Sequence, residues 1–133
     1  MYLVALALIV FLPADDAKPM TGVVAMVANW LATVGVPFDV GYTVLEFLAN
    51  VALFVPLGVL LPLTTPLRRP WQVLAVGVAS TGFIELVQLT IPGRVSSWSD
   101  VAANTIGTAV GLAFHAALEA ARHRPQPSEA RAR

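Results

Sequence analysis

Three apolar segments long enough to cross a lipid bilayer dominate this sequence. They occupy residues 44–63, 71–91 and 99–118, and about 20 apolar residues suffice for a membrane-spanning helix. Of the 133 residues, 57% are hydrophobic and only 12% are charged, whereas soluble domains carry about 25% charged residues. A chain of this length cannot bury so many apolar side chains in a core of its own. The pattern therefore predicts an all-α integral membrane protein.

The first residues of the chain are also apolar, but their run is short for a span. Residues 1–14 resemble either a signal-peptide core or an interfacial piece by length. A signal peptide needs a basic leader and a small-residue cleavage site, and no Lys or Arg precedes Lys18. We therefore expect a first transmembrane helix whose start can lie upstream of Met1. The result is one domain over residues 1–121, a bundle of about four transmembrane helices.

The connection between the first and second spans has mixed character. Its middle, residues 20–34, is apolar with polar interruptions, which predicts a helix in the membrane interface anchored by Trp30. A re-entrant fifth span is the alternative. Asp39 is expected in the link that follows. Residues 122–133 are charged and contain proline, which predicts a disordered cytoplasmic tail.

The basic residues predict the orientation, because Lys and Arg accumulate on the cytoplasmic side. Two of them separate spans two and three and four follow span four, whereas only two lie on the other side. We expect both termini inside (N-in, C-in) and the connections around residues 13–43 and 92–98 outside. The six on the predicted inner side are Arg68, Arg69, Arg122, Arg124, Arg131 and Arg133, and the two outside are Lys18 and Arg94.

Several classes of site are excluded by composition. The chain has no cysteine, which excludes disulfides, thiolate catalysis and cysteine-based metal sites. Two histidines make a histidine-rich metal site improbable, so we predict no metal and no cofactor. The formal net charge is zero, and nothing indicates nucleic acid as a partner.

Polar residues inside the predicted spans are the main functional signal. A charged side chain at the bilayer centre costs at least ~2.5–3.5 kcal/mol, so such residues mark functional sites by default. Asn50, Glu85 and Asn104 each lie five or six residues inside the outer end of a span, roughly 7.5–9 Å at the helical rise. We therefore predict one polar pocket that opens to the outside. Its members, at helical spacing, are Glu46 and Asn50; Thr81, Glu85 and Gln88; and Asp100, Asn104 and Thr108.

The connection at residues 92–98 passes over this predicted pocket. It contains Arg94, the only cation near three carboxylates in the sequence. A guanidinium there pairs with Glu85 or Asp100, or presents its planar fork to a phosphate or carboxylate ligand. Both interpretations stay open.

Each of these residues also has an ordinary structural interpretation. Glu46 can solvate its carboxylate at the interface, and Asn50 can join helices by a hydrogen bond. Gln88 can simply be a partner of Glu85. Asp100 fits the Ser-x-x-Asp start of a helix, where an acid meets the positive end of the helix dipole. Residues 107–111 form a Gly-x-x-x-Gly pattern, which is typical of close helix packing.

Four of these segments, in this order, resemble the VanZ-like family. They are NVALFVPLG at residues 50–58, IELVQ at 84–88, PGR at 92–94 and DVAANTIG at 100–107, and the resemblance covers roughly residues 46–118. The family consists of membrane proteins named after a teicoplanin-resistance accessory protein. The resemblance implies a role at the outer face of the cell membrane and, in some members, lower susceptibility to lipoglycopeptides. It implies no particular reaction.

Three functions of different classes follow. A binding module would hold a cell-envelope lipid, a lipid-linked cell-wall intermediate or a lipophilic drug; an enzyme would modify such a lipid by acid–base chemistry. The third, a structural subunit, would act through a partner protein and bind no ligand of its own. We favour recognition or modification of an envelope lipid and leave oligomer formation open. The predicted ligand-binding residues are Arg94, Asn50, Gln88 and Asn104, and the predicted catalytic residues are Glu85, Asp100 and Glu46.

Overall fold

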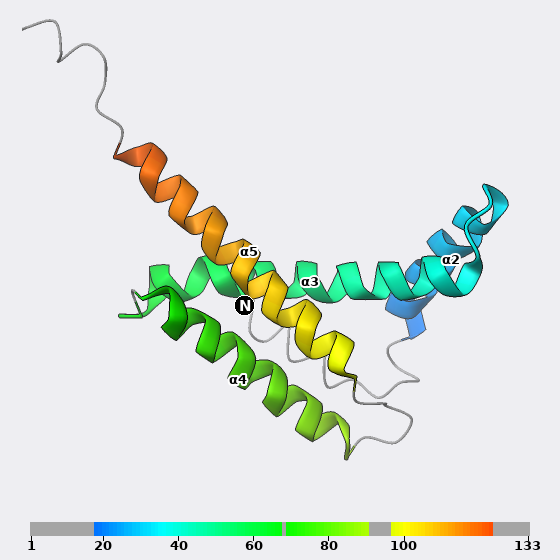
Figure 1. The fold of residues 1–133 in the computed structure, drawn as a ribbon. Coiled ribbons are helices and arrows are strands. Elements are labelled where there is room, and N and C mark those ends of the chain that lie inside the picture. The colour runs from blue at the N-terminus through cyan, green and yellow to red at the C-terminus, as the bar shows by residue number, and fades with distance from the viewer. Residues whose placement is uncertain (1–17, 68, 91–96, 124–133) are drawn as a thin grey trace, which may run out of the picture.

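The computed structural model describes residues 18–67, 69–90 and 97–123. These residues form four α-helices: α2 (Lys18–Thr33), α3 (Phe38–Thr64), α4 (Pro70–Gln88) and α5 (Trp98–Arg122). α4 and α5 lie side by side, α5 crosses α3, and α2 lies against the first turns of α3 (Figure 1). No strand occurs in the described residues, which confirms the all-α prediction for this part of the chain.

Three of the four helices are long and apolar enough to cross a membrane. They are α3, α4 and α5, and they contain most of the three spans predicted from residues 44–63, 71–91 and 99–118. The predicted first span, at residues 1–14, lies outside the described residues. The N-in, C-in orientation stays a prediction.

α3 begins earlier than the hydropathy pattern predicts. Its first residue is Phe38, so Asp39 lies in the first helical turn rather than in a link. Pro37 precedes the helix with φ −54°, and a carboxylate in the first turn meets the positive end of the helix dipole. The sequence prediction equated the start of the helix with the start of the apolar run. At 27 residues, α3 is about 40 Å long, longer than the roughly 30 Å hydrocarbon core of a bilayer.

The ends of α4 and α5 also differ from the prediction. α4 ends at Gln88, before the predicted end at residue 91, since Pro92 disfavours helical backbone in the residue before it. α5 continues to Arg122, past the predicted end at residue 118. Arg122 was assigned to the tail, but it lies in the last turn of α5 and pairs with Glu119 at 3.1 Å.

α2 confirms a helix in the segment where an interfacial or re-entrant element was predicted. Its Ala28 is fully buried against α3, where a Cβ built on Gly41 would lie 3.7 Å from the Ala28 backbone. The opposite side of α2 exposes Val23, Met26 and Trp30. A location in the membrane interface remains a prediction.

The helices bury few apolar side chains. Large ones such as Phe83 and Leu86 are more than half exposed, as expected when lipid rather than water surrounds the bundle. Apart from glycines and Pro62, the buried residues are almost as often polar as hydrophobic. They are the hydrophobic Ala28, Phe54, Leu57, Val73, Ile84 and Ala103, and the polar Thr81, Glu85, Gln88, Asn104 and Thr108.

Glycines allow α3 and α5 to cross at backbone contact. A Cβ built on Gly107 would collide with the Val51 carbonyl oxygen of α3, and one on Gly111 would collide with the Val55 carbonyl oxygen. From the other helix, a Cβ on Gly58 would lie 2.8 Å from the Leu112 nitrogen and closer still to a carbonyl of α5. The close-packing interpretation of the Gly-x-x-x-Gly pattern is therefore correct.

Candidate functional site

The polar residues of α4 lie on one buried face, as their spacing predicts. Thr81 is fully buried, and Glu85 and Gln88 expose only 6% and 7% of their surface. A repeat of three or four residues stacks side chains on the same side of a helix. This side faces α5, since Thr81 accepts a hydrogen bond from Asn104 of that helix. The interior between α4 and α5 is therefore polar.

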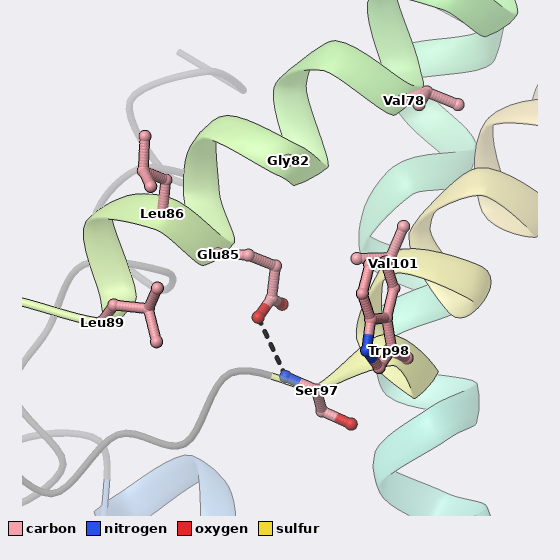
Figure 2. A pocket seen from close by; sticks show the side chains of 8 residues that line it. All are labelled: Val78, Gly82, Glu85, Leu86, Leu89, Ser97, Trp98 and Val101. Carbon is pink, nitrogen blue, oxygen red and sulfur yellow. Dashed lines mark hydrogen bonds between the residues drawn. The ribbon is translucent and has the colours of Figure 1, made fainter.

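Glu85 binds the first turn of the neighbouring helix. Its Oε2 accepts a hydrogen bond from the backbone N–H of Ser97 at 3.0 Å, and its carboxylate points from α4 to the start of α5 (Figure 2). Backbone N–H groups at a helix start have no partner within their own helix. A carboxylate at this position satisfies one of them and meets the positive end of the helix dipole.

The start of α5 confirms half of the Ser-x-x-Asp interpretation. Ser97 is the N-cap, with its Oγ accepting from the Ser99 N–H at 3.2 Å, and Asp100 lies in the first turn. In a full capping box the acid would also accept from the backbone of the cap residue. Here that N–H is bound by Glu85 of α4. The acid of the capping box thus comes from a different helix.

Asp100 instead links α5 to α3. Its Oδ1 accepts a hydrogen bond from the Asn50 side-chain amide at 3.0 Å. The Ser99 hydroxyl contacts the same oxygen at 3.4 Å. The prediction that residues of spans two and four meet is confirmed for this pair.

Asn104 links α5 to α4 one turn deeper. Its amide nitrogen donates to the Thr81 hydroxyl at 2.9 Å, and its backbone carbonyl accepts from the Thr108 hydroxyl at 3.0 Å. Asn104 is 5% exposed. Its side-chain oxygen has no hydrogen-bond partner among the described residues. A buried acceptor in this environment is a place for a donor from water or from a ligand.

Two predicted site residues are not placed in this cluster. Glu46 lies one turn before Asn50 on α3, and its side chain is exposed. Arg94 lies outside the described residues, so its predicted contacts with the carboxylates stay a prediction. The structure therefore brings together Asn50, Glu85, Asp100 and Asn104 through α5, with Gln88 buried on the same face of α4 as Glu85.

An open pocket of about 430 Å³ adjoins this polar cluster. Glu85 and Ser97 provide its polar atoms, while the remaining lining is apolar (Figure 2). From α4 the lining residues are Val78, Gly82, Glu85, Leu86 and Leu89, and from the start of α5 they are Ser97, Trp98 and Val101. Pockets for small ligands have this size and this combination of apolar walls and few polar groups.

The sequence reasoning did not identify this pocket, nor did it assign site roles to Ser97 or Gly82. A Cβ built on Gly82 meets no atom within 4 Å, so this glycine leaves open space rather than permitting a helix contact. The available signal was its position three residues before Glu85, on the same face of α4. Trp98 lies at the first position of α5 with 88% exposure.

The chemistry available at the site is that of two carboxylates held by defined donors. Glu85 is oriented by a backbone N–H and Asp100 by a carboxamide. Such groups bind hydrogen-bond donors and cations, and they can exchange protons with a ligand. Within the described ranges, no cluster of three or more His, Cys, Asp or Glu side chains is placed to hold a metal ion.

A comparison with known protein families identifies the family of this chain. A family model described as VanZ/LLP1 matches residues 1–119. The chain belongs to the VanZ/LLP1 family. The match includes α3, α4, all but the last residues of α5 and every residue of the polar cluster, so the VanZ-like resemblance is confirmed. Searches of curated proteins and of solved structures gave no significant match.

Proposed function

We propose that this VanZ/LLP1 protein recognises or modifies the head group of a cell-envelope lipid, or of a lipophilic drug, at the site around Glu85. The site would face the extracytoplasmic side of the cell membrane. In a cell that depends on lipid-linked cell-wall intermediates, such an activity would contribute to tolerance of teicoplanin-type drugs.

One observation carries this proposal: the polar cluster lies beside an open apolar pocket on helices that are apolar enough to span a membrane. Glu85 belongs to both, since it binds Ser97 and lines the pocket. Polar residues that only strengthen the packing of helices do not require a pocket beside them. A lipid presents the same combination, a polar head joined to apolar chains.

The depth of the site supports a head group as its ligand. Ser97 and Trp98 start α5 at one end of the bundle, and Asn104 is only six residues further along, roughly 9 Å. Tryptophan is enriched where the hydrocarbon meets the head groups. The acceptor groups of the cluster therefore lie within reach of the level at which a lipid carries its polar part.

A structural role is the second candidate, and the hydrogen-bonding pattern favours it in part. Two hydrogen bonds between side chains join helices directly, Asn50 to Asp100 and Asn104 to Thr81. Such bonds strengthen helix packing in membranes, typically by about 0.6 kcal/mol. In that case the protein would act through a partner, and the pocket would have no ligand.

The two candidates are distinguished by substitutions that keep the fold. We would express the protein in a susceptible host and measure the inhibitory concentration of teicoplanin for wild type, Glu85→Gln and Arg94→Ala. Gln keeps an oxygen that can accept from Ser97, so insertion and helix packing should stay near normal. Glu119→Gln is the matched control, because Glu119 is a partly exposed carboxylate near the opposite end of α5.

Loss of tolerance with Glu85→Gln and Arg94→Ala, but not with Glu119→Gln, would support the site. Wild-type tolerance in both site variants, at equal amounts in the membrane, would refute the proposal. Binding and catalysis are then separated with purified protein and a labelled envelope-lipid extract. A change in lipid mass that Glu85→Gln removes indicates catalysis, whereas retention of unaltered lipid indicates binding.

A further inference from the structure

The apolar lining of the pocket lies along α4 on both sides of Glu85. Leu86 and Leu89 lie toward the end of the helix, and Val78 lies seven residues before Glu85, a distance of about 10 Å at the helical rise. One leaflet of the hydrocarbon core is roughly 15 Å thick, half of the bilayer core. The lining from Glu85 to Val78 therefore covers about two thirds of one leaflet.

The polar atoms of the pocket are confined to one place. Glu85 and Ser97 provide them, and the side chains toward Val78 and Val101 are apolar. The walls on the other side of Glu85 are exposed, with Leu86 at 66% and Leu89 at 65%. An occupant must therefore present a polar group to Glu85 and Ser97 and a hydrocarbon chain to the apolar walls.

Gly82 gives this surface its depth. A Cβ built there meets no atom within 4 Å, in contrast to Gly58, Gly77, Gly107 and Gly111, which lie against neighbouring helices. In the middle of a helix, glycine is destabilising relative to alanine. Helix packing does not require a glycine at position 82, but an alkyl chain lying along α4 would occupy the space beside it.

From these observations we propose that the pocket is the binding site for a single hydrocarbon chain of the lipid, running from Glu85 past Gly82 to Val78. The inference rests on the proposed function and extends it: the ligand is an amphiphile bound by its chain as well as by its head group. The chain enters from the surrounding leaflet through the open side, so the ligand need not leave the membrane. A head group at Glu85 and Ser97 is then positioned by the chain below it.

The decisive variant fills the pocket without touching the head-group residues. Gly82→Leu places a branched side chain where the lipid chain would lie. Gly22→Leu is the matched control, since Gly22 also lies in a helix, is exposed and has no atom within 4 Å of a built Cβ. Removing a methylene from an apolar contact weakens binding about fourfold, so displacement of a few methylenes should reduce lipid retention about tenfold or more.

Retention can be measured after reconstitution into vesicles of phosphatidylethanolamine and phosphatidylglycerol at three to one. The protein is extracted in mild detergent, and the lipid that remains bound is quantified by mass spectrometry. We expect wild type and Gly22→Leu to retain lipid and Gly82→Leu to lose it. Equal retention in all three would overturn the proposal.

A photo-crosslinker identifies the occupant directly. Benzoylphenylalanine replaces Leu86, which lines the pocket, or Phe83, which has a similar exposure of 61% and does not line it. After detergent extraction, a lipid-mass adduct at position 86 with little at position 83 would support the chain site. A crosslink from position 86 to residues 1–17 of the same chain, or to a second copy, would refute it.

The two proposals fail in different ways. If Gly82→Leu leaves lipid retention and drug tolerance unchanged while Glu85→Gln abolishes tolerance, the chain site is wrong and the head-group function stands. If Gly82→Leu abolishes retention while Glu85→Gln and Arg94→Ala keep full tolerance, the chain site stands and the proposed function is wrong.

Discussion

Gly58→Ala should separate α3 from α5 and destabilise the bundle. The added Cβ would lie 2.8 Å from the Leu112 nitrogen and 3.0 Å from the Gly111 Cα, and it would overlap the Thr108 carbonyl oxygen. All three atoms belong to backbone or to a glycine, so no flexible side chain can move aside. Relief requires the two helices to move apart by roughly an ångström, because ordinary carbon contacts lie near 3.5–4.0 Å.

The magnitude follows from the contacts that this movement weakens. A radial gap of 0.5–1 Å forfeits about a quarter to a half of each dispersion contact, and α3–α5 is the most extensive interface among the described helices. Overpacking of a close contact typically costs about 1–3 kcal/mol. We expect a value near the upper end, since the Asn50–Asp100 hydrogen bond at 3.0 Å joins the same two helices.

The measurement is the free energy of unfolding in mixed micelles, titrated with a denaturing detergent and followed by circular dichroism. Gly82→Ala is the control, because its Cβ would meet no atom within 4 Å. We expect the control to be as stable as wild type or slightly more stable, since alanine is the better helix former. If Gly58→Ala is as stable as Gly82→Ala, the backbone contact between α3 and α5 does not exist as described.

Three further predictions concern the polar contacts. A double-mutant cycle of Asn50→Ala and Asp100→Ala, measured by the same unfolding titration, should give a coupling near 0.6 kcal/mol and below about 1.7 kcal/mol; additive effects would show that the two side chains do not interact. Thr81→Val removes the only partner described for the Asn104 amide nitrogen and should cost about 1–3 kcal/mol, whereas Thr105→Val, which removes a bond to the Val101 carbonyl of the same helix, should cost less. Ser97→Ala should lose roughly 1 kcal/mol through the missing N-cap, and Ser97→Asp should recover most of it.

Hydropathy was sufficient to place the bodies of three helices, because the length of an apolar run is set by the thickness of the bilayer. It was less informative about helix ends, which depend on local backbone chemistry. Asp39 precedes the apolar run, so hydropathy places it in a link, yet a carboxylate is favourable in the first turn of a helix. Arg122 was read as tail, although a cation in the last turn of a helix is equally favourable.

Helical spacing predicted which polar residues share a face, and it was correct for Thr81, Glu85 and Gln88 on α4. It did not predict their partners. Whether Asp100 binds its own cap or Asn50 of another helix depends on the angle at which α3 and α5 cross, and that angle is set by glycines elsewhere in the sequence. The pocket beside Gly82 was missed for a related reason: an absent side chain gives no hydropathy signal.

The contact between Glu85 and Ser97 has a consequence for the way in which α4 and α5 assemble. The backbone amide at the start of α5 is bound by a carboxylate of α4, so the beginning of one helix is completed only when the other lies beside it. Formation of α5 at this end and its docking on α4 are therefore coupled.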